Sequence, residues 1–188
     1  VAGAALYGET VPRTGKHRLP CWLQNARVLD AANGIPKESA PALLTRAAIL
    51  RLRGTPKRTR VFNHSINAKA PCRTTHMSAW ATEIDQLSFE HDVLVVQSAG
   101  NISKPALAAE LNSSPAGSHP YPAYLNDANY RVANPAHSLQ ALTVGSVAYA
   151  AFDNTRWRSF ATAPHEPSAF TRCGLAIWGV IKPEVVEF

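Results

Sequence analysis

The sequence has few cysteines, few acidic residues and no long apolar runs. Of its 188 residues, 3 are cysteine, 1 is methionine and 13 are aspartate or glutamate. Three scattered cysteines, none at metal-ligand spacing from another, cannot form the disulfide framework of a small secreted domain. Apolar runs are short, as in Val93–Val96, whereas a membrane-spanning helix needs ~20 apolar residues. We therefore expect neither a disulfide scaffold nor a membrane partner.

The sequence also shows no targeting segment. It opens Val1-Ala2-Gly3 without a methionine and without a basic stretch followed by an apolar one, so no signal peptide is visible. The compartment is not determined by these features, and a bacterial cytoplasm is slightly favoured over secretion. With 46% hydrophobic and 17% charged residues, the composition is that of a folded protein rather than a disordered one. The length corresponds to one domain or part of one.

Basic residues exceed acidic ones, and much of the excess is local. The net charge is +6. Six cations occur with no acid among them: Arg46, Arg51, Arg53, Lys57, Arg58 and Arg60. Such a cluster can bind phosphates, but it is also typical of a solvated helix end, where cations are stabilised. No nucleic-acid motif or interleaved aromatic residues accompany it, so we expect no nucleic-acid partner.

Hydrophobic patterning predicts strands and helices in alternation. Strands are predicted over 26–29, 61–66, 93–96, 142–148 and 181–188. One helix is predicted from an N-cap at Ser39, through Leu52, to a stop at Gly54. A second is predicted over 75–89, with one buried stripe formed by Met77, Trp80, Ala81, Ile84 and Leu87. Residues 102–136 form a long excursion with a short helix over 106–111.

This order indicates an α/β fold with three layers. Alternating strands and helices favour a mostly parallel sheet with helices on both faces. Ligands bind such sheets outside the carboxyl ends of the strands. The residues to inspect are therefore Asp30, Ser65–Asn67 and Ser98–Asn101.

Several motifs that would define a chemistry are missing. No GxGxxG follows the first predicted strand, and the sequence has no phosphate-binding GxxxxGK[ST] loop, no HExxH and no GxSxG. We therefore expect no cofactor and no metal. His64 and Ser65 are adjacent on a predicted strand, so their side chains point to opposite faces and cannot act as a base and nucleophile pair.

The end of the third predicted strand is more informative. Ser98-Ala99-Gly100 leaves room for a ligand or another backbone to approach. Asn101 then supplies a neutral amide donor, a group that can stabilise a developing oxyanion without titrating. The alternative is an ordinary turn, because Gly and Asn are also favoured there.

Six segments, taken in order, resemble a subtilisin-like serine protease. Val1-Ala2-Gly3 resembles the residues that follow the catalytic histidine in the family motif HGTHVAG. Residues 61–67 and 95–101 resemble two strands that border the active site in this family. The segments and the family patterns are 61–67 (VINMSLGG), 95–101 (VVxAAGN), 134–147 (YPG…VIAVGAV), 169–174 (SFSSxG) and 182–186 (the strand before GTS). Each match is weak alone, but the shared order and spacing make the combination specific.

The resemblance also implies that residues 1–188 lack the catalytic triad. In this family the triad runs Asp, His, Ser along the chain, and all three map outside residues 1–188. The resemblance therefore implies one partial, truncated peptidase domain, with residues 102–136 as an excursion within it. The parent protein is expected to be a serine endopeptidase and this segment alone inactive. The alternative is a non-catalytic peptide-binding or scaffolding module of the same fold.

The resemblance further assigns roles to the strand ends. It implies that Asn101 is the oxyanion donor and that the substrate is a peptide or protein. One wall of the primary specificity pocket would be Ser65, Ile66 and Asn67, and the other Ser98, Ala99 and Gly100. The small residues of the second wall favour a roomy pocket for a bulky apolar side chain. Asn67, however, stands where the family usually has glycine, so a side chain there is expected either to narrow the pocket or to change how the substrate lies in it.

The resemblance also implies two structural features. The family's proline bond at this place is often cis, which predicts a cis peptide between Asn134 and Pro135. The parts of the fold outside these residues would normally cover some of the sheet. We therefore expect an exposed apolar patch and self-association of the truncated domain.

Overall fold

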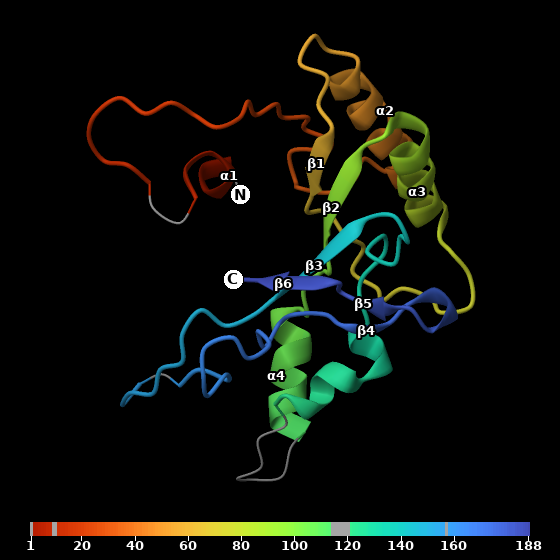
Figure 1. Cartoon of the computed structure of the whole chain (residues 1–188). Coiled ribbons are helices and arrows are strands. Elements are labelled where there is room, and N and C mark those ends of the chain that lie inside the picture. The colour runs from red at the N-terminus through yellow and green to blue at the C-terminus, as the bar shows by residue number, and fades with distance from the viewer. Residues whose placement is uncertain (1, 9–10, 114–120, 157) are drawn as a thin grey trace.

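A computed structural model describes residues 2–8, 11–113, 121–156 and 158–188. Its centre is a four-stranded parallel sheet in the order β1-β2-β3-β6 (Figure 1). The strands are β1 (Val61–His64), β2 (Leu94–Ser98), β3 (Leu142–Ser146) and β6 (Val185–Glu187). A separate antiparallel pair is formed by β4 (Gly174–Leu175) and β5 (Ile181–Lys182). The predicted α/β class with a parallel sheet is confirmed, and the strand predicted over 181–188 is divided between β5 and β6.

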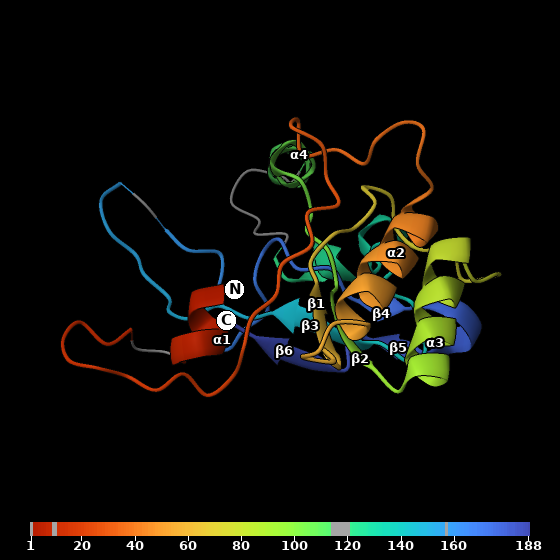
Figure 2. The same ribbon diagram turned by 90° about the horizontal axis from the view of Figure 1, so that it is seen from above.

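Two helices pack together on one side of this sheet in both views (Figure 1 and Figure 2). They are α2 (Pro41–Arg53) and α3 (Ala79–His91). The predicted N-cap of α2 at Ser39 is wrong, because the capping position is Ala40, which makes no side-chain bond. Helix α3 begins later than predicted, because the hydroxyl of Ser78 accepts a hydrogen bond from Ala81 N and starts the helix there.

The hydrophobic core lies between these helices and the sheet. Its members come from α2, α3 and the sheet, as the predicted periodicity required: Ile49, Trp80, Ile84, Leu87, Val93, Val95 and Ala141. Met77, which the prediction included in the stripe, precedes α3 and is only half-buried. The predicted stripe is therefore correct within the helix.

The opposite face of the sheet carries apolar side chains that remain exposed. Val61 pairs with Leu94 and Val144 pairs with Val185, so the strand alternation directs these side chains to one face. Val61 is 62% exposed, Leu94 42% and Val185 43%. The six-residue helix α1 (Ala2–Tyr7) lies on this side of the sheet in both views (Figure 1 and Figure 2). The expected apolar patch is thus present, and we call it the open face.

The described residues of the excursion over 102–136 form mainly helical elements. It contains α4 (Lys104–Ser113) and two 3-10 turns, η1 (Ala123–Asn126) and η2 (Ala128–Tyr130), and a third turn, η3 (Ile177–Gly179), lies near the C-terminus. The predicted short helix over 106–111 lies within α4. The peptide bond between Asn134 and Pro135 is cis, as predicted. Within the described ranges, no helix has the length and apolar content needed to cross a membrane.

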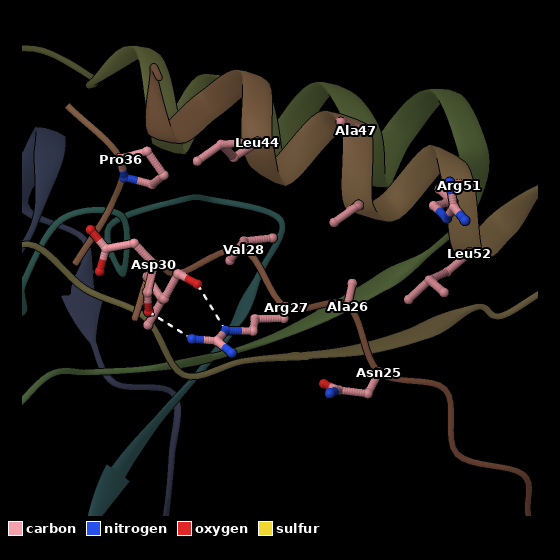
Figure 3. Close-up of a pocket in the computed structure, with 12 residues that line it drawn as sticks. Asn25, Ala26, Arg27, Val28, Asp30, Pro36, Leu44, Ala47, Arg51 and Leu52 are labelled. Atoms are coloured by element: carbon pink, nitrogen blue, oxygen red, sulfur yellow. Dashed lines mark hydrogen bonds between the residues drawn. The ribbon is translucent and has the colours of Figure 1, made fainter. Parts of the chain in front are cut away.

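The strand predicted over 26–29 is not formed. This segment is extended but pairs with no strand in the described structure, and it runs beside α2 (Figure 3). Arg27 donates to the carbonyls of Leu29 and Asp30, while the Asp30 carboxylate accepts from the amides of Ala32 and Gly34. Local side-chain bonds therefore replace a sheet ladder, and Asp30 closes a turn instead of facing a ligand site.

Candidate functional site

The carboxyl ends of β1 and β2 lie side by side. The two strands are parallel neighbours, and their last paired residues are His64 and Gln97. Beyond this pair the chain continues as residues 65–67, here called the first bank, and residues 98–101, here called the second bank. The structure thus brings together all the residues that the resemblance assigned to substrate and oxyanion binding.

Side chains join the two banks beyond the end of the ladder. The Asn67 amide nitrogen donates to the Ser98 carbonyl at 2.9 Å, and the Ser98 hydroxyl donates to the Asn67 amide oxygen at 2.5 Å. Both residues are half-buried. We call this pair the Asn67–Ser98 clasp. Because it uses both ends of the carboxamide, it holds the Asn67 side chain across the gap between the banks.

A buried glutamine forms hydrogen bonds to the main chain of both banks. Gln97 is fully buried, and its amide nitrogen donates to the carbonyls of Ser98 at 3.1 Å and Ile66 at 3.4 Å. Its amide oxygen lies 2.6 Å from Nδ1 of His64, so the network assigns the ring proton to that nitrogen. Gln97 therefore fixes one carbonyl of each bank.

The surroundings of His64 disfavour its protonated form. Its ring packs edge-on against Trp80 with centroids 5.5 Å apart, and Thr45 Oγ1 lies 3.5 Å from Nε2. Burial lowers the pKa of His64, and the hydrogen bond to Gln97 opposes this effect only in part. The ring points away from Ser65, whose hydroxyl accepts from Asn63, so the two do not form a catalytic pair.

The second bank is packed from behind by the returning excursion. Gly100 has a φ of +93°, and a Cβ at this position would lie 2.6 Å from the Cβ of Ala133. Glycine is therefore required both by its backbone conformation and by the close approach of its neighbour. Ala133 N donates to the Ala99 carbonyl at 2.8 Å, and Ala68 N donates to the Asn134 carbonyl at 2.7 Å. The excursion thus contacts the second bank and Ala68, the residue that follows the first bank.

Asn101 presents an available amide at the end of the second bank. Its side chain is exposed, and it has no hydrogen-bond partner in the part of the chain that the structure describes. The backbone forms a β-bridge with Thr171, and its carbonyl accepts from Arg172 Nε at 3.1 Å. The residue is therefore anchored through its main chain while its amide N–H₂ can donate to an oxyanion.

Arg172 and Gln97 were missed as site-supporting residues by the sequence reasoning. Arg172 is only 6% exposed, and its guanidinium donates to four carbonyls, with N···O distances of 3.0–3.1 Å. The acceptors come from both sides of the site and from the excursion: Lys69, Asn101, Asn129 and Arg131. Burial lowers the pKa of Arg172, but a guanidinium stays protonated. The one sequence signal was an arginine in an otherwise uncharged stretch.

Several residues of the basic cluster near the end of α2 contact other parts of the chain. Arg46 forms an ion pair with Glu83, with N and O 2.6 Å apart, and Arg60 pairs with Asp92. The Lys57 ammonium lies 3.9 Å from the ring centroid of Trp22. Arg51 and Arg53 lie in the last turn of α2, where cations are stabilised by the helix. These contacts support the interpretation of the cluster as a solvated helix end.

Neither metal-ligating groups nor cysteines add chemistry near the two banks. Within the described ranges, no group of three or more His, Cys, Asp or Glu side chains is arranged to hold a metal ion. All three cysteines are free thiols, and burial raises the pKa of Cys72 and of Cys173. Buried thiols with a raised pKa are poor nucleophiles. The described residues of the two banks therefore offer hydrogen-bond donors and acceptors.

Comparisons with known proteins identify the family and some similar proteins. The model of the subtilase family matches residues 1–187. An uncharacterized protein, y4bN of Sinorhizobium fredii, is 33% identical over 117 residues, which cover 59% of this chain and 26% of that protein. This chain therefore spans about a quarter of the length of that curated relative. The solved structure of the prenylagaramide maturation protease PagA matches with a TM-score of 0.38 and 17% identity, over 77% of this chain and 40% of that one.

The family match extends over almost the entire sequence and includes every segment that carried the resemblance. The chain belongs to the subtilase family of serine peptidases.

Proposed function

We propose that this chain forms part of a serine endopeptidase domain in which Asn101 stabilises the oxyanion of peptide-bond hydrolysis. The observation that carries the proposal is the exposed side-chain amide of Asn101, which follows the carboxyl end of β2 and has no hydrogen-bond partner among the described residues. As a substrate carbonyl becomes tetrahedral, negative charge collects on its oxygen. A donor that is already oriented then stabilises the transition state without having to reorganise.

The neighbouring banks supply the substrate-binding surface in this proposal. The first bank, Ser65–Asn67, pairs with an extended peptide as an added strand, a common mode of peptide recognition. The second bank, Ser98–Gly100, forms the facing wall, and the primary pocket lies between the two. The substrate is a peptide or protein, and residues 1–188 are one part of a single peptidase domain.

The nucleophile and its base come from outside these residues. None of the family's three triad residues maps onto the chain, so residues 1–188 are expected to be inactive alone. An oxyanion donor without a nucleophile and base leaves only a trace rate over water. A fluorogenic peptide incubated with the pure 188-residue chain should show no turnover sensitive to a serine-directed inhibitor. Inhibitor-sensitive turnover would contradict this part of the proposal.

The role of Asn101 is tested in the protein made from the complete reading frame. Asn101→Ala should lower kcat by roughly 10²–10³, the loss known from removing one oxyanion donor in an enzyme of this family. KM should change little, because the hydrogen bond forms mainly in the transition state. Asn126→Ala, an exposed asparagine in η1, is the matched control and should retain full activity.

Three outcomes separate the alternatives. Loss of kcat in Asn101→Ala alone supports the oxyanion role. Equal activity of Asn101→Ala and the unaltered protein overturns it. Peptide binding without cleavage by the complete protein would instead support the non-catalytic peptide-binding or scaffolding module.

The open face supports a further expectation for the isolated chain. Apolar side chains exposed together on one sheet face favour association in water. Purified residues 1–188 should therefore form dimers or larger species in sedimentation experiments. Leu94→Lys, at an exposed position of this face, should shift the chain toward monomer. A monodisperse monomer at high concentration would refute the expectation.

A further inference from the structure

We infer that the Asn67–Ser98 clasp closes the primary pocket, so that the substrate carries a small residue, such as Gly, Ala or Ser, before the scissile bond. This inference rests on the proposed function, because it concerns the pocket between the two banks. It also replaces the expectation of a bulky apolar side chain, which followed from the small residues of the second bank alone.

The clasp occupies the place where a side chain would enter. The paired residues of β1 and β2 end at His64 and Gln97, and in the described structure side chains form hydrogen bonds between the banks beyond this pair. Asn67 reaches from the first bank to both the carbonyl and the hydroxyl of Ser98 on the second. Its carboxamide is therefore held at two points across the gap, and a ligand group inserted there must displace it.

Displacement is unfavourable for an apolar group and unnecessary for a small one. A phenyl or isobutyl group would break both hydrogen bonds of the clasp and offer no donor or acceptor in return, so polar atoms of half-buried Asn67 and Ser98 would be left unpaired. A methyl group or hydrogen leaves the clasp intact. Selection thus comes from the chemistry of the clasp as well as from the space that it fills.

The banks cannot separate to make room. Gly100 leaves no space behind the second bank, because a methyl group there would already lie 2.6 Å from Ala133. Buried Gln97 bonds one carbonyl on each bank, at Ile66 and Ser98, and is itself held by His64. The width of the pocket is therefore set by packed and hydrogen-bonded groups, and Asn67 is the residue that closes it.

The test measures preference for the residue before the scissile bond. The complete protein is assayed with a fluorogenic peptide series that differs only there, with Gly, Ala, Leu or Phe. The unaltered protein should favour Ala over Phe in kcat/KM. Asn67→Gly should shift the Phe-to-Ala ratio toward Phe by about tenfold to a hundredfold, the range that pocket volume controls in enzymes.

Two further variants separate the clasp from general damage. Asn67→Ala removes both hydrogen bonds but keeps a Cβ, and it should shift the ratio in the same direction by a smaller factor. Asn33→Gly is the matched control, because Asn33 is exposed in a turn with a φ of +57° that glycine adopts freely. It should leave the ratio unchanged. An unaltered protein that cleaves after Phe as well as after Ala overturns the inference, as does an unchanged ratio in Asn67→Gly.

A binding measurement distinguishes failure of this inference from failure of the proposed function. N-acetylated tripeptide amides ending in Ala or Phe are titrated into the same proteins by calorimetry. If no peptide is cleaved, the proposed function fails. The inference about the clasp is then tested by binding alone. The ratio of the affinity for the Phe peptide to that for the Ala peptide should be about tenfold higher in Asn67→Gly than in the unaltered protein. Equal relative affinities in the two proteins would overturn the inference on its own.

Discussion

Replacing Arg172 by methionine should destabilise the protein more than any surface charge change. The guanidinium donates four hydrogen bonds to main-chain carbonyls and is almost completely buried. Methionine keeps most of the packed stem but has no donor. The substitution therefore removes the hydrogen-bond donor of four main-chain carbonyls, those of Lys69, Asn101, Asn129 and Arg131.

The magnitude follows from opposing terms. Hydrogen bonds to a charged group contribute about 1.5–3 kcal/mol each, so four of them amount to roughly 6–12 kcal/mol. Burying a cation costs several kcal/mol, which methionine avoids. The residues that carry the acceptors are exposed or half-exposed, so water partly replaces the lost donors. We expect a net loss of about 3 kcal/mol for Arg172→Met. Arg172→Lys should lose about half as much, because an ammonium cannot reproduce the planar geometry.

The assay is urea denaturation followed by tryptophan fluorescence, with the free energy of unfolding extrapolated to water. Arg51→Met is the matched control, since Arg51 is exposed on α2 and methionine is a good helix former. The control should lie within about 0.5 kcal/mol of the unaltered protein. If Arg172→Met also lies within that margin, the four carbonyl bonds do not stabilise the fold and the reasoning fails.

Three other changes probe the buried polar groups and the backbone. Burial lowers the pKa of His64 below its ordinary 6.5. At pH values near and below 6.5, the unfolded chain therefore binds a proton at His64 more readily than the folded chain does. Unfolding free energy should therefore fall as pH drops below about 6.5, and His64→Gln should flatten part of that slope in urea melts; an unchanged slope contradicts this. Gly100→Ala should cost about 2 kcal/mol more than Gly179→Ala in thermal melts, since both have positive φ but only the first meets a neighbour; equal losses would refute the clash. Glu184→Gln should cost about 2 kcal/mol in urea melts by leaving the fully buried Lys182 ammonium without its carboxylate, and an unchanged midpoint would show that the pair contributes nothing.

The sequence by itself predicted the features that depend on local patterns. The apolar run before Gln97 specified β2, and the helical spacing of Trp80, Ile84 and Leu87 specified the buried face of α3. The positions of the two banks followed as well, because parallel strands that are consecutive in the chain place their carboxyl ends at one edge of the sheet. The resemblance to subtilases required only the order and spacing of such segments.

Other features were decided only by contacts between residues distant in the sequence. The segment over 26–29 has the composition of a strand, but whether it forms one depends on a partner strand, and no pattern within the segment specifies that partner. Asn67 and Ser98 are 31 residues apart, and Arg172 lies 103 residues from Lys69. A side-chain hydrogen bond depends on distances of about 3 Å between such groups, which exist only after the chain has packed. Sequence therefore placed the banks of the site, and tertiary structure decided what lies between them.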